Sequence, residues 1–136
     1  MSGRVYILGG YQTDFAENWT RNGCELFDSF GNTVRNAIDT VGLDPEDVDV
    51  AHIGNFAAEL FCKQGHLGGF FAALHPAFSG IPASRHEAAC ASGSIATLSA
   101  AADIESGRYG LAAVVGIEQM RNVPAQVAAD YIGAPA

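Results

Sequence analysis

Basic residues are scarce in this sequence. Lysine and arginine number 7 against 15 aspartates and glutamates, so the 136-residue chain carries a formal net charge of -8 at pH 7. This balance argues against nucleic acid or an anionic membrane as the main partner, because both would repel an acidic surface. Charged residues make up only 16% of the chain, a low share for a monomer, which suggests that a partner or further chain covers part of the surface.

Long apolar runs and paired cysteines are missing too. No run approaches the roughly 18 residues that cross a bilayer, so we expect no membrane span. The three cysteines have no CxxC spacing, which predicts neither a disulfide framework nor a zinc site and favours a reducing, cytoplasmic location. The histidines form no i,i+4 pair and the glycines match no phosphate-binding loop or dinucleotide pattern, so we expect no metal and no cofactor.

What the sequence does contain is an alternation of strands and helices. Short apolar runs closed by turn residues predict strands near 4–8, 50–56, 83–88 and 111–115. The last of these, "LAAVV", has no polar alternation and is expected to be buried on both faces. Strands that alternate with helices are typical of the α/β class, here with a layered, mixed and mostly parallel sheet that is doubly wound.

Helices are predicted from apolar residues that recur every three or four positions. They span 24–41, ended by Gly42, then 67–74 and 92–106. The last helix carries small side chains on nearly every side, so we expect it to be closely packed all round. Beyond Met120 the sequence predicts no further element.

Cys90 lies at the junction of the third strand and the alanine-rich helix, in "RHEAACASGS". Ligands of parallel sheets collect where strands end, and a helix N-terminus stabilises a thiolate. The helix supplies typically about 0.3–1 kcal/mol, whereas lowering a cysteine pKa from about 8.5 to about 7 needs roughly 2 kcal/mol. A base such as histidine would have to supply the rest, and Gly93 would allow close approach of a substrate. Most free cysteines are inert packing residues, so both interpretations stay open here.

Taken together, these stretches resemble the thiolase family. Further likenesses are "VYILGGYQTDF", "VGLDPEDVDVAHIGN", Glu87 three residues before the cysteine, and "RNVPAQVA", the last two being closer to sterol-carrier-type thiolases. The family's Cys-x-Ser-Gly turn and Gly-x-Glu-x-Met motif are matched by Cys90, Ser92 and Gly93 and by Gly116, Glu118 and Met120. The resemblance implies the N-terminal half of a thiolase-like fold.

The resemblance also implies acyl transfer through coenzyme A thioesters, by thiolytic cleavage or Claisen condensation of 3-ketoacyl-CoA, as in acetyl-CoA acetyltransferases. Cys90 would accept the acyl group, and its backbone N–H would contribute to an oxyanion hole. Gly93, Glu118 and Met120 would lie at the substrate site, with Met120 as an apolar wall, while Glu87 would be a buried structural or interface residue. Coenzyme A would be a substrate rather than a cofactor.

Several family motifs are not found in the sequence. Thiolases also use an Asn-Glu motif, a Gly-His-Pro motif whose histidine activates the nucleophile, and a second cysteine in a glycine-rich loop; the only His-Pro, His75-Pro76, precedes Cys90 and lacks the glycine. We therefore expect residues 1–136 to be an incomplete thiolase N-terminal domain, a fragment or one chain of a split enzyme, inactive alone.

The resemblance implies partners as well. Segment 83–88 would pair with its twin across a two-fold axis in a homodimer or homotetramer, or a second chain would carry the C-terminal half. Two alternatives remain, a β-ketoacyl-synthase-like condensing enzyme and a non-catalytic thiolase-fold interaction module.

Overall fold

A sheet of three parallel strands, in the order β2-β1-β3, forms the centre of the computed structural model, which describes residues 3–133. β1 (Val50–Gly54) is the central strand and is buried along its whole length. β2 (Ala83–His86) and β3 (Ala112–Gly116) pair with β1 on either side. Because Gly54 lies opposite His86, the strands finish together at one edge, which is where the following loops gather.

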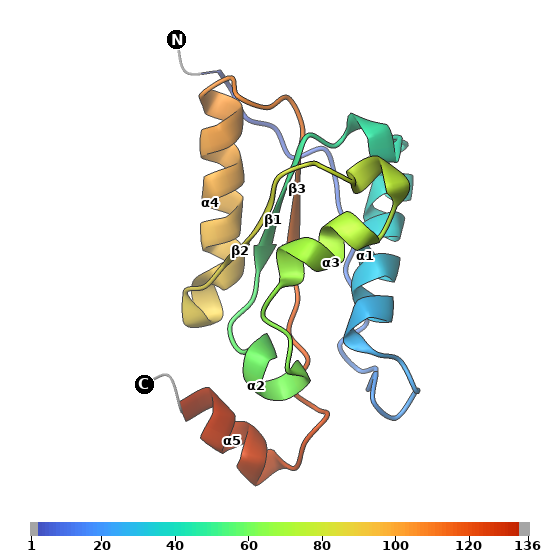
Figure 1. Ribbon diagram of the computed structural model, residues 1–136, viewed down its shortest axis with the longest axis vertical. Coiled ribbons are helices and arrows are strands. Elements are labelled where there is room, and N and C mark those ends of the chain that lie inside the picture. The colour runs from blue at the N-terminus through green and yellow to red at the C-terminus, as the bar shows by residue number, and fades with distance from the viewer. Residues whose placement is uncertain (1–2, 134–136) are drawn as a thin grey trace.

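Helices lie on both sides of this sheet (Figure 1). α4 (Ser92–Glu105) packs on one face, while α1 (Leu26–Val41) and α3 (Leu67–Ala73) lie on the other. α2 (Ala58–Cys62) and α5 (Ala125–Gly133) are at the end of the molecule where the strands finish. The arrangement confirms the predicted α/β class with a doubly wound sheet, in which every strand pair is parallel.

The helix predicted over 24–41 is confirmed as α1, which begins two residues later than predicted, at Leu26. Its buried residues include Phe30 and Val34, one turn apart on the face toward the sheet. The Glu25 N–H donates to the Asp28 carboxylate at the start of the helix. At its end Gly42 adopts a left-handed conformation with φ 67°, which glycine reaches without steric cost.

Short 3-10 turns link the remaining elements, and aromatic residues fill the core. The turns are η1 (Pro45–Asp47), η2 (Pro76–Phe78) and η3 (Ala89–Ala91). Phe71 and Phe78 are stacked with ring centroids 4.4 Å apart and are almost fully buried. Burying one such ring stabilises the fold by about 1.5–3 kcal/mol. The aromatic layer therefore gives β1 a firm support on the face opposite α4.

The strand predicted near 4–8 is not present. This segment is irregular, Ile7 is 88% exposed, and among residues 3–133 no backbone hydrogen bond joins the segment to a strand. An apolar groove of about 620 Å³ is lined by residues 4–11 together with β3, α1 and α4. The apolar run thus lies near the sheet without pairing with it.

Four further expectations are corrected. β3 is not buried on both faces: within its span only Val115 is buried, because one edge of the strand has no neighbour in the described part of the chain. α4 is not enclosed all round, since Leu98 is 65% exposed while Ala96 and Ala100 face the sheet. The chain after Met120 does form an element, α5. The predicted strands at 50–56 and 83–88 each end two residues earlier.

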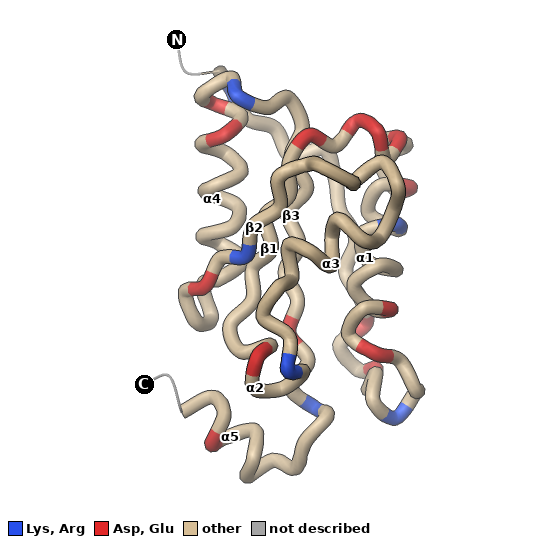
Figure 2. Tube along the Cα trace, in the orientation of Figure 1, with Lys and Arg blue, Asp and Glu red and all other residues tan. Residues whose placement is uncertain are grey.

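Charges are sparse and unevenly placed. The acidic residues around η1 lie at the end of the molecule opposite α2 and α5 (Figure 2). They are therefore remote from the edge where the strands finish. None of the helices in residues 3–133 combines the length and the hydropathy that a membrane crossing requires.

Candidate active site

Cys90 lies in a tight turn between a strand and a helix, as the sequence predicts. β2 ends at His86, η3 carries Cys90, and α4 begins at Ser92. The Cys90 side chain is exposed. A 14-residue helix presents unpaired N–H groups and the positive end of its dipole at its first turn, so the thiol lies beside a region that favours negative charge.

Ser92 fixes the shape of this turn. Its hydroxyl donates to the Ala89 carbonyl at 2.7 Å and accepts from the Ala88 N–H at 2.9 Å. The side chain is only 4% exposed, so neither bond competes with water. Ala89 has φ 49°, a left-handed conformation that is unfavourable for a residue with a Cβ. The Ser92 bonds therefore hold the residue before Cys90 in a conformation that it would not choose by itself.

The backbone N–H of Cys90 is free of partners in the described structure. The N–H of Ala89 is taken by the Glu87 carboxylate at 2.6 Å, and that of Ala91 by the Ala88 carbonyl at 2.9 Å. The N–H of Cys90, which lies between these two residues in the sequence, donates to no acceptor within residues 3–133. Glu87 is exposed, not buried as expected, and it supports the turn locally. An exposed thiol thus sits on a residue whose amide is available to a ligand oxygen.

Gly93 is where the helix meets the central strand. A Cβ placed on Gly54 would lie 2.7 Å from both Cα and N of Gly93, whereas a Cβ on Gly93 would meet nothing within 4 Å. Real Cβ contacts are essentially never so short, so the C-terminal end of β1 touches the first turn of α4 through bare backbone. Gly93 therefore has backbone on one side and open space on the side where its own side chain would be.

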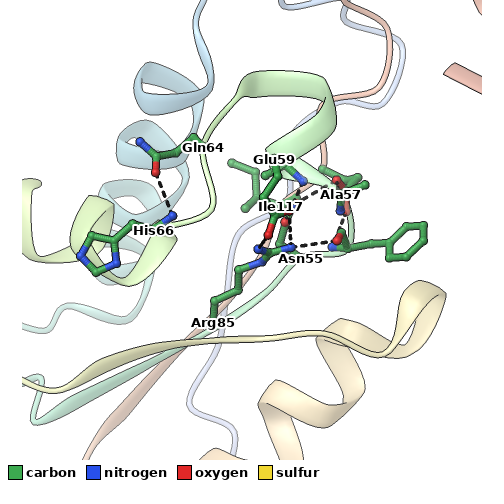
Figure 3. Close-up of polar contacts among 10 residues, drawn as sticks. Asn55, Ala57, Glu59, Gln64, His66, Arg85 and Ile117 are labelled. Atoms are coloured by element: carbon green, nitrogen blue, oxygen red, sulfur yellow. Dashed lines mark hydrogen bonds and ion pairs between the residues drawn. The ribbon is translucent and has the colours of Figure 1, made fainter. Parts of the chain in front are cut away.

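Glu118 joins the two loops that follow β1 and β3. Its carboxylate accepts from the Phe56 N–H at 2.8 Å, from the Ala57 N–H at 3.3 Å and from Asn55 Nδ2 at 3.1 Å. Asn55 also donates to the Ile117 carbonyl at 2.7 Å (Figure 3). Both oxygens of Glu118 are therefore occupied by its own chain. The group anchors the loops at the strand ends.

Sequence reasoning missed Asn55, which is 2% exposed and forms the centre of this anchor. The one feature of the sequence that could have pointed to Asn55 is its position directly after the buried strand β1. Met120, predicted as an apolar wall, is 40% exposed and follows the same loop. Met120 can therefore contact a ligand or a partner, unlike the carboxylate of Glu118.

Arg85 points from β2 toward α2. Its guanidinium forms an ion pair with Glu59 and donates to the Phe56 carbonyl at 2.8 Å (Figure 3). The hydrogen bond from Arg85 holds the pKa of the Glu59 carboxyl below its usual value. A hollow of about 530 Å³ lies beside this pair and is also lined by Glu87. Cys90 lines neither this hollow nor the apolar groove.

Within residues 3–133, no side chain forms a hydrogen bond with the sulfur of Cys90. The described residues therefore place no base in contact with this thiol. His52 and His86 contact each other, and His75 accepts from the Ala77 N–H. The site therefore offers a thiol, an amide and a helix terminus but no group that removes the thiol proton.

Comparison with known proteins gives a consistent result. The chain matches the family described as "Thiolase, N-terminal domain" over residues 5–134. An acetyl-CoA acetyltransferase of Methanocaldococcus jannaschii is 38% identical over 119 residues, which are 88% of this chain and 29% of the relative. One of Methanothermobacter thermautotrophicus is 34% identical over 119 residues, 88% of this chain and 30% of the relative. The chain thus spans less than a third of the length of either relative.

Proposed function

Because the chain belongs to the thiolase family, we propose that Cys90 is the acyl-accepting nucleophile of a thiolase-type acyltransferase that acts on coenzyme A thioesters. The observation that carries this proposal is the turn itself. At the N-terminus of α4, the thiol of Cys90 is exposed, and the N–H of the same residue has no acceptor within residues 3–133. This combination suits attack on a carbonyl together with stabilisation of the oxyanion that results.

The proposed chemistry has two half-reactions. The Cys90 thiolate attacks the acyl carbonyl carbon, a carbon–sulfur bond forms, and the carbonyl electron pair moves to oxygen, near the Cys90 N–H. Collapse of this adduct expels the leaving group, either coenzyme A thiolate or, from a 3-ketoacyl-CoA, the acetyl-CoA carbanion, which takes up a proton. In the second half-reaction coenzyme A, whose thiol has given its proton to a base, or an acetyl-CoA carbanion attacks the acyl carbonyl carbon; the carbon–sulfur bond to Cys90 breaks, and Cys90 leaves as the thiolate.

The described residues do not complete this machinery. We propose that the base that activates Cys90 and the group that handles the α-proton come from chain outside residues 3–133, within the same polypeptide or on a second chain. Two observations support this: no base contacts Cys90, and the chain spans less than a third of the two relatives. In this proposal residues 1–136 act as an incomplete N-terminal domain that supplies the nucleophile.

Glu118, Gly93 and Met120 have different parts in this proposal. Glu118 supports the site indirectly, because it holds the loop after β1. Gly93 leaves space beside the first turn of α4 for the acyl-CoA, and Met120 offers an exposed apolar surface. Only the last two would contact substrate.

We also propose that two copies associate through β2. Its outer edge has no partner in the described structure, and proteins normally cover such an edge. The three free cysteines suit a reducing cytoplasm. Sedimentation equilibrium tests the association: a species that remains monomeric at every concentration would contradict it.

Acyl loading tests the nucleophile directly. The full chain is incubated with acetyl-CoA or acetoacetyl-CoA, and each cysteine peptide is examined by mass spectrometry for an added acetyl group. We expect the acetyl group on Cys90 and not on Cys24 or Cys62, and none on a Cys90→Ser variant. Loading is expected to be slow in this chain and faster once the C-terminal part of a relative is added.

Alkylation provides a measure that does not depend on loading. With iodoacetamide near neutral pH, Cys90 should react faster than N-acetylcysteine at the same pH, because exposure alone cannot exceed the rate of a free thiol. A rate equal to that of Cys24, together with no acetyl transfer in an assembled complex, would favour the non-catalytic interaction module. Transfer to malonyl rather than acetyl thioesters would favour the condensing-enzyme alternative.

A further inference from the structure

Three polar side chains from three elements meet where β1, β2 and α4 pack together. His52, in the middle of β1, is only 5% exposed. Its Nε2 lies 3.0 Å from Asp103 Oδ2 on α4, and its Nδ1 lies 2.8 Å from Nε2 of His86 on β2. We call Asp103, His52 and His86 the histidine network. Sequence reasoning treated these histidines as scattered, because 34 positions separate them.

Two serines flank the network. Ser84 Oγ lies 3.0 Å from His86 Nε2, and Ser99 Oγ lies 3.5 Å from His86 Nδ1. Ser99 and Asp103 are one turn apart on the same face of α4. The helix therefore approaches the two rings at two successive turns, which fixes both its position and its rotation on the sheet.

The network joins β2 and α4, the two elements between which the segment that carries Cys90 runs. This segment leaves the sheet directly after His86 and enters α4 at Ser92. His52 contacts β2 through His86, four residues before Cys90, and α4 through Asp103, which lies 11 residues beyond Ser92 near the end of the helix. A change at the contact between the two rings would therefore act on the last residue of β2 and, through the whole of α4, on the way the helix sits on the sheet.

The contact between the His52 and His86 rings depends on how many protons the two rings carry. The two nitrogens that face each other at 2.8 Å form a hydrogen bond only if one of them lacks a proton. When both rings are imidazolium, two N–H groups and two positive charges oppose each other. The titratable groups that face the rings are each other and Asp103. Burial, and then the charge of His52, lower the pKa of His86, whereas Asp103 acts in the opposite direction.

We propose that the histidine network is an acid-sensitive positioning device, which keeps the Cys90 turn in its reactive shape near neutral pH and releases it when both rings are protonated. The proposal rests on the proposed role of Cys90. His52 and His86 are positioning residues here: they act through the backbone on either side of the cysteine and do not touch the substrate.

Amide hydrogen exchange of the full chain tests the release. Protection of the Ala88 and Ala91 amides is measured at about pH 7.5 and about pH 5.5 and corrected for the intrinsic exchange rate at each pH. We expect protection to be about three- to tenfold lower at the acid pH, since uptake of one proton changes an opening equilibrium by at most about tenfold per pH unit and the lowered pKa of His86 confines the change to the acid part of this interval. Amides within α1 should not follow this change.

Variants identify which residues cause the loss of protection at acid pH. His86→Gln should abolish the step, Asp103→Asn should move its midpoint to lower pH, and the matched control His66→Gln, an exposed histidine, should leave it in place. Should His86→Gln fail to fold, NMR titration of the imidazoles in the unsubstituted chain replaces it: the His86 midpoint must coincide with the loss of protection. A step that persists in His86→Gln, a midpoint that differs from that of His86, or an equal loss in α1 would overturn the proposal.

The two proposals fail separately. Exchange in the turn does not require Cys90 to react, so it tests the network alone. Acetyl loading of Cys90 near neutral pH does not require the acid step, so it tests the nucleophile alone.

Discussion

Gly54 and Gly93 touch through their backbones, and the contact leaves no room for a methyl group on Gly54. This contact brings the first turn of α4, and with it the Cys90 turn, against the end of the central strand. It also allows a sharp test, because the two glycines differ in the space around their missing side chains.

Gly54→Ala should lower the free energy of unfolding by about 1–3 kcal/mol, the usual effect of overpacking a close contact. Gly93→Ala should leave it unchanged or raise it by up to about 1 kcal/mol, because the new methyl group meets nothing within 4 Å and alanine is the better helix former. Urea denaturation measures both. Equal destabilisation by the two substitutions would show that the backbones are not in contact.

Ser92→Ala should loosen the Cys90 turn. It leaves the Ala88 N–H without its buried acceptor and removes one of the two donors to the Ala89 carbonyl, which keeps the Ser92 backbone N–H, at a cost of about 1–3 kcal/mol. We expect slower acetyl loading of Cys90 as well, because the left-handed conformation of Ala89 is no longer held. Ser94→Ala, an exposed position on the same helix, is the control. The interpretation fails if both variants load and unfold like the parent chain.

Glu118→Gln should destabilise the strand-end loops. An amide in place of the carboxylate turns an N–H₂ group toward backbone N–H groups that need an acceptor, and we expect a loss of about 1–3 kcal/mol. Glu105→Gln, at an exposed position in the last turn of α4, should change stability little. Thermal unfolding followed by circular dichroism compares them, and a Glu118→Gln curve that overlays the parent curve would refute the anchoring role.

The thiol of Cys62 predicts a loss of stability at alkaline pH. Burial raises its pKa, and the charge of Glu118 adds to the effect. The folded chain disfavours the thiolate, so the neutral thiol contributes to the free energy of unfolding. This contribution is fully present below the pKa of the thiol in the unfolded chain, about 8.5, and is lost as the pH rises through its pKa in the folded chain. The decrease in Tm between about pH 8 and about pH 10 should therefore be larger for the parent chain than for Cys62→Ala. Cys24→Ala should decline like the parent, and identical declines in all three would contradict the prediction.

The elements that sequence reasoning located well are those specified locally. α1 has an apolar stripe with a glycine at its end, and the junction that carries Cys90 is marked by a strand-like run followed by small residues. The strand near 4–8 was wrong because an apolar run becomes a strand only if an edge is close enough to pair with it, and here a groove intervenes. α5 was missed; it is a nine-residue helix, and none of its residues is buried in the core.

In the site too, features set by neighbouring residues could be predicted and those that join distant positions could not. The place of Cys90 follows from neighbouring residues, whereas the anchor formed by Asn55 and Glu118 joins positions 63 apart. Such contacts depend on strand order and register, which periodicity does not contain. The contact between His52 and His86 was out of reach for the same reason.

Among residues 3–133, nothing pairs with the outer edge of either β2 or β3, and the two open edges have different consequences. Two-fold pairing at β2 would fuse two copies into one continuous sheet that still ends in β3 on either side. A dimer of this kind would therefore still have two unpaired β3 edges, each with the apolar segment 4–8 beside it. A preparation of this chain at high concentration should accordingly grow past the dimer into larger assemblies unless something else occupies the β3 edge.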